Sequence, residues 1–191
     1  MNYFFVTGWN TPASLLATFL ASTEQTLASK WVELDYRPYS SLTELYAHWQ
    51  QQIAQGPCVI VAWSLGGNLA LDFLRQYEHQ CQALICIATN LNFVDEQYGM
   101  SKTVFVDFYD QFQQQPLQQN KRFMQMVSMG TDKAIQKMCR TDYQKHQLSP
   151  YFLQQLAWLQ SIKLTQEHIP ACYSEFWFGH GDLLVPAKAE K

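Results

Sequence analysis

The segment Ala62-Trp63-Ser64-Leu65-Gly66-Gly67 is the part of the sequence most clearly suited to chemistry. It places a serine between an apolar run and a helical pattern, as in the G-x-S-x-G nucleophile elbow, with alanine at the first position. Small residues two positions before and after Ser64 let a strand and a helix approach closely, so the turn holds the serine exposed in a strained backbone conformation. The helix N-terminus and the Leu65 amide would there stabilise an oxyanion. The alternative is a serine that caps an ordinary helix.

Two other segments supply candidate partners for this serine. Thr7-Gly8-Trp9 follows the first expected strand, and the flexible Gly8 would let the Trp9 amide serve as a second oxyanion donor. Asp182 follows the last expected strand and fits the chain order serine, acid, histidine, in which the acid orients the imidazole. An aspartate in a glycine-rich turn is the alternative for Asp182. Trp9 and Trp63 fit the walls of an apolar acyl pocket as well as they fit core packing.

The base that should activate the serine is harder to assign, because a serine hydroxyl is a weak nucleophile until a histidine takes its proton. No histidine follows Asp182 in the sequence. His180 lies two residues before Asp182, but neighbours on one turn do not supply the geometry in which an imidazole contacts both acid and serine. The other histidines fall on expected helices or their ends, where surface positions are ordinary: His48, His79, His146 and His168.

Strands and helices alternate through the first half of the chain. Strand patterns occupy 3–6, 31–35, 58–63 and 82–88, and helical patterns occupy about 12–28, 40–55 and 65–77. This alternation predicts a parallel sheet with helices on both faces, and the β-branched run at 58–63 suits a central strand. Residues 101–166 are helical in composition, and a strand pattern returns at 173–178. We therefore expect a core at 1–100, an inserted helical cap at 101–169, and the core resumed at 170–191.

Composition limits the class of protein. A chain of 191 residues with 48% apolar residues predicts one globular domain, and a net charge of −3 excludes a generally basic nucleic-acid-binding chain. The five cysteines are odd in number and form no C-x-x-C pair, which favours reduced thiols and a cytoplasmic location. No signal peptide or membrane-spanning run is present in the sequence. We expect a monomer without nucleic-acid or membrane partners.

These residues resemble the α/β-hydrolase superfamily and, more closely, the pimeloyl-[acyl-carrier protein] methyl ester carboxylesterases of biotin synthesis. The resemblance rests on the elbow and on further motifs: Gly8-Trp9, Phe112-Gln-Gln-Gln115, Arg122-Phe123, Met129-Gly130-Thr131, Gly179-x-x-Asp182 and Val185-Pro186. It implies an α/β-hydrolase sheet with a helical cap, and a serine esterase that cleaves the methyl ester of pimeloyl-acyl-carrier protein. It implies no metal or diffusible cofactor.

The resemblance also implies roles for individual residues. Ser64 would be the nucleophile, Asp182 the triad acid, Trp9 and Leu65 the oxyanion donors, and Trp9, Trp63 and Phe123 the walls of the acyl channel. Arg122 aligns with the arginines that such esterases present to the carrier, and nearby cations could substitute for the others: Lys133, Lys137 and Arg140.

The distribution of charge fits a carrier partner. Residues 101–169 hold eight basic and five acidic side chains, or +3, and the rest of the chain carries −6. A basic cap suits an acidic carrier protein, although an ordinary solvated helical surface would also explain these charges.

The sequence departs from the family pattern at several points. Thr7 stands where a histidine is usual, and Ala62 stands where the elbow usually has glycine. The chain starts at what would be the third strand, and the family histidine lies well beyond the acid, so the resemblance implies a C-terminally truncated chain without the terminal strands. Two alternatives follow: a generic small-ester or lactone hydrolase, or an inactive hydrolase-like module that binds a carrier.

Overall fold

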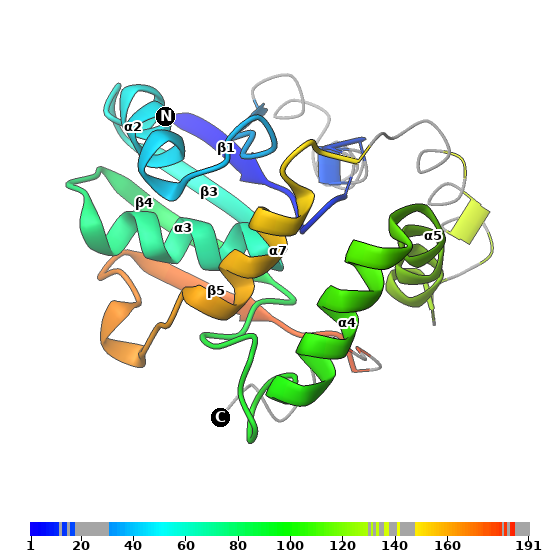
Figure 1. The fold of residues 1–191 in the computed structure, drawn as a ribbon. Coiled ribbons are helices and arrows are strands. Elements are labelled where there is room, and N and C mark those ends of the chain that lie inside the picture. Colours follow the sequence, from blue (N-terminus) through cyan, green and yellow to red (C-terminus); the bar gives the residue numbers. More distant parts are fainter. Residues whose placement is uncertain are drawn as a thin grey trace.

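A single parallel sheet forms the centre of the computed structural model (Figure 1). The structure describes residues 1–11, 13–14, 16–17, 31–129, 131, 133, 136–137, 141, 148–180, 182 and 184–185. Within these ranges the sheet has five strands in the order β2-β1-β3-β4-β5. Their bounds are β1 (Asn2–Val6), β2 (Trp31–Glu33), β3 (Cys58–Trp63), β4 (Cys81–Ile87) and β5 (Tyr173–Trp177). The predicted parallel sheet, with 58–63 as its central strand, is confirmed.

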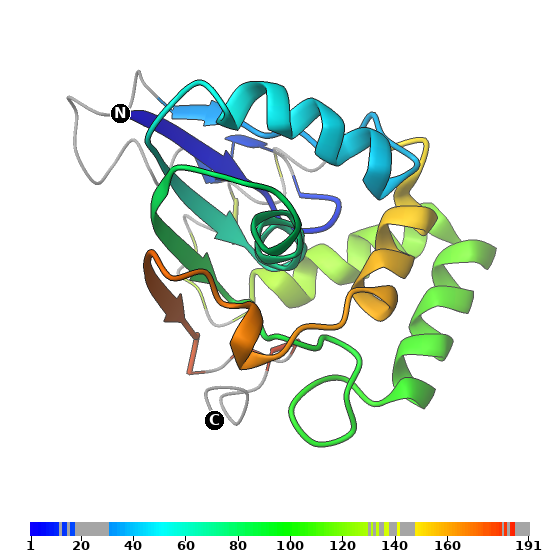
Figure 2. The ribbon, with the colours of Figure 1, turned by 90° about the vertical axis from the view of Figure 1, so that its left-hand side faces the viewer.

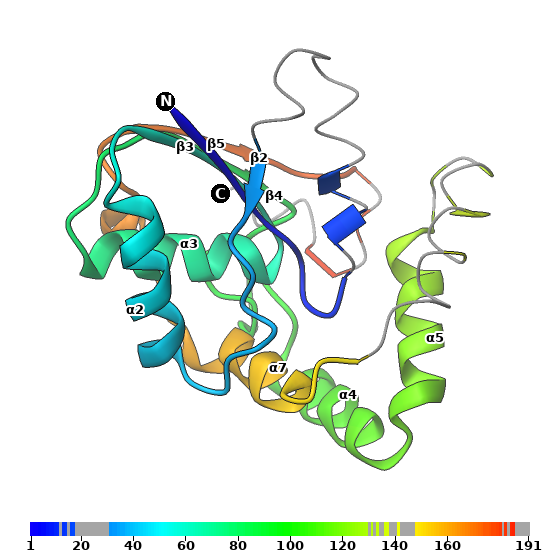
Figure 3. The ribbon, with the colours of Figure 1, turned by 90° about the horizontal axis from the view of Figure 1, so that it is seen from above.

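Both faces of the sheet are covered, as the continuous apolar character of β3 predicts. Helices α2 (Leu42–Ile53) and α3 (Leu65–Gln76) lie on one face (Figure 3), where Ile60 joins the main core. Val61 points to the opposite face and packs with Leu16, which lies in a helical stretch. Most of the predicted helix at 12–28 lies outside the described residues, so its extent remains a prediction.

Helices α2 and α3 are joined by a buried polar network as well as by apolar contacts. The Tyr46 hydroxyl donates to Asp72 Oδ2 at 2.7 Å, and the Arg75 Nη2 donates to Asp72 Oδ1 at 2.6 Å. Gln76 Nε2 donates to Asp72 Oδ2 at 2.8 Å. Burial raises the pKa of Tyr46, and the Asp72 charge adds to this shift. The network therefore keeps the Tyr46 hydroxyl protonated and the buried carboxylate paired.

Three further helices follow, the first two beyond the ends at which the strands finish and the third against α3, on the face of the sheet that α3 covers (Figures 1 and 2). They are α4 (Lys102–Gln114), α5 (Pro116–Val127) and α7 (Phe152–Ser161), and the short 3-10 helix η2 (Gln166–His168) follows them. The predicted helical character of this part is confirmed where it is described, and Pro116 begins α5 as a proline at the first helical position can. No helix in the described ranges is long and apolar enough to cross a membrane.

The cysteines among the described residues carry free thiols. Cys58, Cys81 and Cys86 are buried in the strands, and Cys172 is half-buried. Their positions fit the behaviour of a thiol as a small apolar side chain. Cys139 lies outside the described residues.

The register of the sheet brings the strand ends together. Val6 pairs with Ala62, and Ile87 pairs with both Trp63 and Trp177. The loops after β1, β3, β4 and β5 therefore start side by side at the same end of the sheet. The chain also passes from β2 back across β1 to β3, so the strand order reverses between β1 and β3, and such switch points are where open α/β sheets bind ligands.

Candidate active site

Ser64 occupies a sharp turn between β3 and α3. Its backbone has φ 53° and ψ −121°, a conformation that non-glycine residues rarely adopt and that costs about 1–3 kcal/mol. The Ser64 N–H donates to Ile87 O at 2.8 Å, which ties the turn to the end of β4. The Ser64 side chain makes no capping hydrogen bond to α3, whose twelve residues are all described. This geometry favours the elbow over the helix-capping alternative.

The glycines after the serine are required by the close approach of α3 to the sheet. A Cβ added to Gly66 would lie 2.6 Å from the carbonyl oxygens of Val6 and Thr7. A Cβ added to Gly67 would lie 2.2 Å from Thr89 Oγ1. The start of α3 is thus pressed against β1 and against the loop after β4. In this arrangement the first N–H groups of α3, including that of Leu65, lie at the same edge as Ser64, with no partner within the helix.

The loop after β1 lies directly against Ser64. A Cβ on Gly8 would lie 3.4 Å from Ser64 Cβ and 3.2 Å from Thr11 Oγ1. Gly8 is not among the described residues with positive φ, so the expected conformational freedom of Gly8 is wrong as the reason for glycine here. The tight contact of such a Cβ would be with the Thr11 hydroxyl, whereas its distance from Ser64 Cβ is that of ordinary van der Waals contact. The loop after β1 thus lies in van der Waals contact with Ser64, as its place after the first strand predicts.

Trp9 packs in the core, which is one of the two roles that the sequence left open for it. Its ring is 3% exposed, and its Nε1 donates to Phe152 O at 2.9 Å on α7. The ring makes edge contacts with Phe112 at 4.8 Å and Phe123 at 5.1 Å between centroids. Trp9 therefore belongs to the core and also joins the β1 loop to α4, α5 and α7.

A cavity of about 300 Å³ opens where these loops meet. It is lined by three of the predicted site residues from different strand ends, Trp9, Ser64 and Asp182, and by two of the predicted walls, Trp63 and Phe123. The rest of the lining comes mostly from apolar or small residues: Gly8, Thr11, Ala88, Met126, Val127, Met129, Thr131, Gly179, Leu184 and Val185. The cavity is thus a mostly apolar space with one serine and one carboxylate on its wall.

Asp182 is held by the turn that follows β5. Its Oδ1 accepts hydrogen bonds from Leu184 N at 2.8 Å and Val185 N at 3.0 Å. Its own N–H donates to Gly179 O at 3.1 Å. This is the bonding of an aspartate in a turn, and the same turn presents the residue to the cavity. Oδ2 accepts no hydrogen bond from a described residue and is available to orient another group.

The described lining of the cavity includes no histidine. His180 is exposed and does not line the cavity, although it is close to Asp182 in sequence. His48 lies in α2, His79 follows α3 and His168 ends η2. The other histidine, His146, lies outside the described residues. The structure therefore joins the serine and the acid but, within the described ranges, shows no imidazole between them.

The basic residues expected to face a carrier lie on the outside of the helical part. Arg122 on α5 is exposed and borders a second, polar hollow together with glutamines of α4 and α5. Lys133 and Lys137 are exposed. None of these three forms an ion pair with a described residue. Arg140 lies outside the described residues.

Sequence reasoning missed two features of this edge. Ala88, which follows β4 and lines the cavity, has a φ of 48°, and Asn10, in the β1 loop, has a φ of 50°. With Ser64 they are the described non-glycine residues of positive φ, and each follows the end of a different strand. Tyr36 was also missed: it follows β2, and its hydroxyl donates to Gly8 O at 2.6 Å. No local pattern marks these residues, because each depends on a partner distant in sequence.

Sequence comparisons agree with the resemblance seen in the motifs. No family model matches the chain. The chain is 29% identical over 170 residues to the biotin biosynthesis bifunctional protein BioHC of Teredinibacter turnerae, covering 74% of this chain and 28% of that protein. It is 31% identical over 80 residues to the pimeloyl-[acyl-carrier protein] methyl ester esterase of Aromatoleum aromaticum, covering 38% of this chain and 32% of that one. The matched part thus spans about a third or less of these curated relatives.

Structural comparison shows the fold. The thermophilic esterase of Thermogutta terrifontis superposes with a TM-score of 0.72 at 14% identity, covering all of this chain and 75% of that one. At this identity the likeness concerns the architecture alone. The chain has the α/β-hydrolase fold, and its sequence is similar to those of pimeloyl-[acyl-carrier protein] methyl ester esterases.

Proposed function

We propose that this α/β-hydrolase-fold protein is a serine carboxylesterase with Ser64 as its nucleophile. The observation that carries the proposal is the backbone of Ser64, held at φ 53° with its side chain unused as a helix cap. Strain of this kind persists only where the surrounding structure enforces it, and it gathers at functional sites. Here Ile87 O, the glycines of α3 and the β1 loop all enforce it.

The geometry supports a defined sequence of events. Ser64 Oγ would attack the carbonyl carbon of an ester bound in the cavity, and the N–H groups of Trp9 and Leu65 would stabilise the oxyanion. Collapse of the tetrahedral intermediate would release the alcohol and leave an acyl group on Ser64. Water would then release the acid and restore the serine. The apolar lining suits an acyl chain, because burial of its methylenes favours binding.

The proton of Ser64 needs an imidazole that Asp182 can orient. The free Oδ2 of Asp182 is placed to accept its N–H, since Oδ1 is occupied by the turn. The described lining supplies no histidine, so His180 is the first residue to test.

The substrate we propose is the methyl ester of pimeloyl-acyl-carrier protein, with methanol as the alcohol released. Support comes from the esterase and bifunctional relatives and from the exposed cations on the helical segment, Arg122, Lys133 and Lys137. Segment 101–169 would act as a cap that shapes the acyl channel through Phe123 and presents Arg122, Lys133, Lys137 and Arg140 to the acidic carrier.

Intact mass after incubation with a fluorophosphonate probe tests the nucleophile. We expect stoichiometric labelling of the 191-residue chain and none of Ser64→Ala, with an unchanged melting temperature. Loss of labelling in His180→Ala would assign the base. A folded wild-type chain that takes up no label would contradict the proposal that Ser64 is an activated nucleophile in this polypeptide.

A comparison of substrates tests the carrier. We expect kcat/KM for the carrier-linked methyl ester to exceed that for free dimethyl pimelate, and the excess to shrink as salt screens the cap. Arg122→Ala should reduce only the carrier-linked value, whereas Lys102→Ala, at the far end of α4, serves as the matched control. Equal kcat/KM for both esters would favour a generic small-ester or lactone hydrolase.

A second function is favoured by one observation, the lack of a histidine in the described cavity lining. An inactive hydrolase-like module would bind the acyl-carrier protein without cleaving its ester. It predicts salt-sensitive binding of the carrier, no fluorophosphonate labelling, and the same affinity in Ser64→Ala as in the wild type.

A further inference from the structure

The peptide between Gly8 and Trp9 is fixed by an unusual number of donors. Gly8 O accepts a hydrogen bond from the Tyr36 hydroxyl at 2.6 Å and from Thr11 Oγ1 at 2.6 Å. It also accepts one from Thr11 N at 3.2 Å. In a trans peptide the N–H points opposite to the carbonyl, so these three donors set the direction of the Trp9 N–H. The same N–H is the proposed second oxyanion donor.

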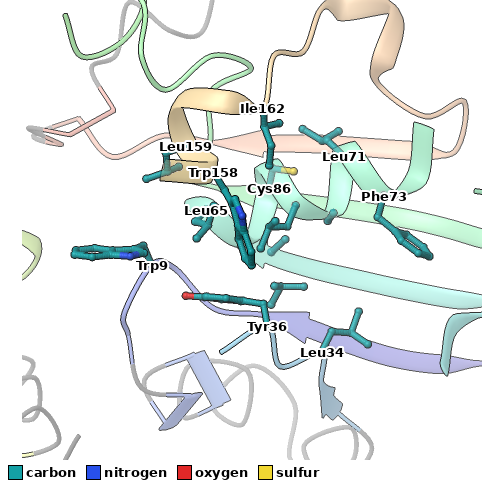
Figure 4. Packing of buried hydrophobic residues seen from close by; sticks show 14 of the residues in the cluster. Trp9, Leu34, Tyr36, Leu65, Leu71, Phe73, Cys86, Trp158, Leu159 and Ile162 are labelled. Atoms are coloured by element: carbon teal, nitrogen blue, oxygen red, sulfur yellow. The ribbon is translucent and has the colours of Figure 1, made fainter. Parts of the chain in front are cut away.

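Tyr36 reaches this carbonyl from the loop after β2. Its side chain is fully buried, and Figure 4 shows its oxygen directed toward the loop that carries Trp9. The Asn10 N–H donates to the Tyr36 hydroxyl at 3.2 Å. A phenol has one proton to donate, so this arrangement commits the proton of Tyr36 to Gly8 O.

The segment that carries Tyr36 is itself held by α7. Gln155 is 1% exposed, and its Nε2 donates to the carbonyls of Tyr36 at 3.2 Å, Arg37 at 2.9 Å and Tyr39 at 3.1 Å. The Trp158 ring meets the Tyr36 ring edge-on at 6.5 Å. The phenol is therefore fixed at its backbone, its ring and its hydroxyl.

We propose that Tyr36 is a positioning residue for ester hydrolysis: its hydroxyl, bound to Gly8 O, aims and polarises the Trp9 N–H toward the oxyanion. A hydrogen bond to a peptide carbonyl increases the donor strength of the N–H on the same peptide, because hydrogen bonds in a chain polarise one another. Donors fixed before the reaction need no reorganisation as charge develops on the substrate. This inference rests on the proposed function and names a residue that acts through the oxyanion loop.

Two observations support the assignment. The Trp9 N–H donates to no described backbone or side-chain acceptor, so it is available to a ligand in the cavity that Gly8 and Trp9 line. Burial raises the pKa of Tyr36 well above its ordinary value, so the phenol remains a donor at every pH at which an esterase would be assayed.

Steady-state hydrolysis of p-nitrophenyl acetate by Tyr36→Phe tests the role. Thr11 still holds Gly8 O in this variant, so we expect kcat to fall about 10-fold, less than the 100-fold or more that follows loss of a whole oxyanion donor, with KM changed less than about 2-fold. Tyr46→Phe is the matched control, since it also removes a buried phenolic hydrogen bond and leaves the site untouched. Wild-type kcat in Tyr36→Phe, or an equal fall in Tyr46→Phe, would overturn the proposal.

A second measurement, by NMR, reports on the peptide between Gly8 and Trp9 and does not depend on turnover. In the isotope-labelled 191-residue protein, Tyr36→Phe should move the carbonyl ¹³C resonance of Gly8 and the amide ¹⁵N resonance of Trp9, and Tyr46→Phe should move neither. Unmoved resonances in Tyr36→Phe would refute the positioning role. A turnover that persists in Ser64→Ala would instead refute the proposed function, and the Gly8 resonance would still decide whether Tyr36 holds the peptide.

Discussion

Tyr46 and Tyr36 are both buried and each donates a short hydrogen bond, but the two hydroxyls have different kinds of partner. Tyr46 lies between α2 and α3 and donates to a carboxylate that Arg75 and Gln76 also satisfy. Tyr36 lies in the loop after β2, where the strands end, and donates to Gly8 O beside the cavity. Both are at least 98% buried. Their hydroxyls have similar burial and bond lengths, so neither property tells the two regions apart.

The partners of the two hydroxyls distinguish the regions. Around Tyr46 the hydroxyl and both carboxylate oxygens of Asp72 are paired with side chains in helices of regular backbone. Around Tyr36 the network ends at a peptide whose N–H faces a cavity, next to backbones of positive φ at Asn10 and Ser64. A closed network contributes stability, whereas an open one holds a donor ready for a ligand. The difference supports the proposal that the loops after the strands form the binding site.

The largest effect should come from the replacement of Asp182, which lines the cavity beside the Tyr36 network. In Asp182→Asn the amide oxygen can still accept from Leu184 N and Val185 N, so the turn and the melting temperature should be kept. An amide cannot stabilise an imidazolium, and kcat should fall about 1,000-fold or more, as expected for the loss of a triad acid. Ester hydrolysis at saturating substrate measures this. An unchanged kcat would remove Asp182 from the catalytic group.

Replacement of Asp72, in the Tyr46 network, should instead lower stability and leave kcat unchanged. Asp72→Asn removes the carboxylate charge, and it should lower the free energy of unfolding by roughly 3 kcal/mol, because this buried group accepts charge-assisted hydrogen bonds from Tyr46, Arg75 and Gln76. Urea unfolding measures this. Turnover per folded molecule should stay at the wild-type value, and a selective loss of kcat would break the comparison between the regions.

The smallest effect is expected on the free energy of unfolding when either tyrosine is replaced by phenylalanine. Tyr36→Phe and Tyr46→Phe should each lower the free energy of unfolding by about 1–3 kcal/mol, because each removes one buried hydrogen bond. The two variants should therefore be similar in urea and different in turnover. If Tyr36→Phe proved far less stable than Tyr46→Phe, its loss of kcat would reflect unfolding, and the Gly8 carbonyl resonance would separate the two causes.

Much of the sheet could be predicted because its strands are marked locally. The run Cys58–Trp63 is too apolar for an exposed strand and too short for a helix, and the structure places it at the centre. The helix at 40–55 was also predictable, since Ser41 Oγ caps it by accepting from Glu44 N at 3.3 Å. The division into core and cap at 101 and 169 remains a prediction, since helices alone do not define a domain boundary.

The candidate site was only partly predictable. The spacing of Ala62, Ser64 and Gly66 suggested a strained turn, and Ser64 has that backbone. Gly8 was expected for its conformational freedom, but its φ is not positive, and an added Cβ would meet the Thr11 hydroxyl at 3.2 Å. The choice of the Trp9 amide as a donor came from its place after β1, but nothing in the sequence near Trp9 indicates what would hold that peptide.

The sequence by itself determined the elbow, because small residues at fixed spacing, a strand before and a helix after are all local properties of the chain. Only the tertiary structure decided which groups meet at the strand ends. Tyr36 and Gly8 are 28 residues apart, and Gln155 lies 119 residues beyond Tyr36. Their contact depends on the strand order β2-β1-β3 and on where α7 packs. Hydrophobic periodicity specifies which face of an element is buried, but it does not specify the neighbour against which that face is buried.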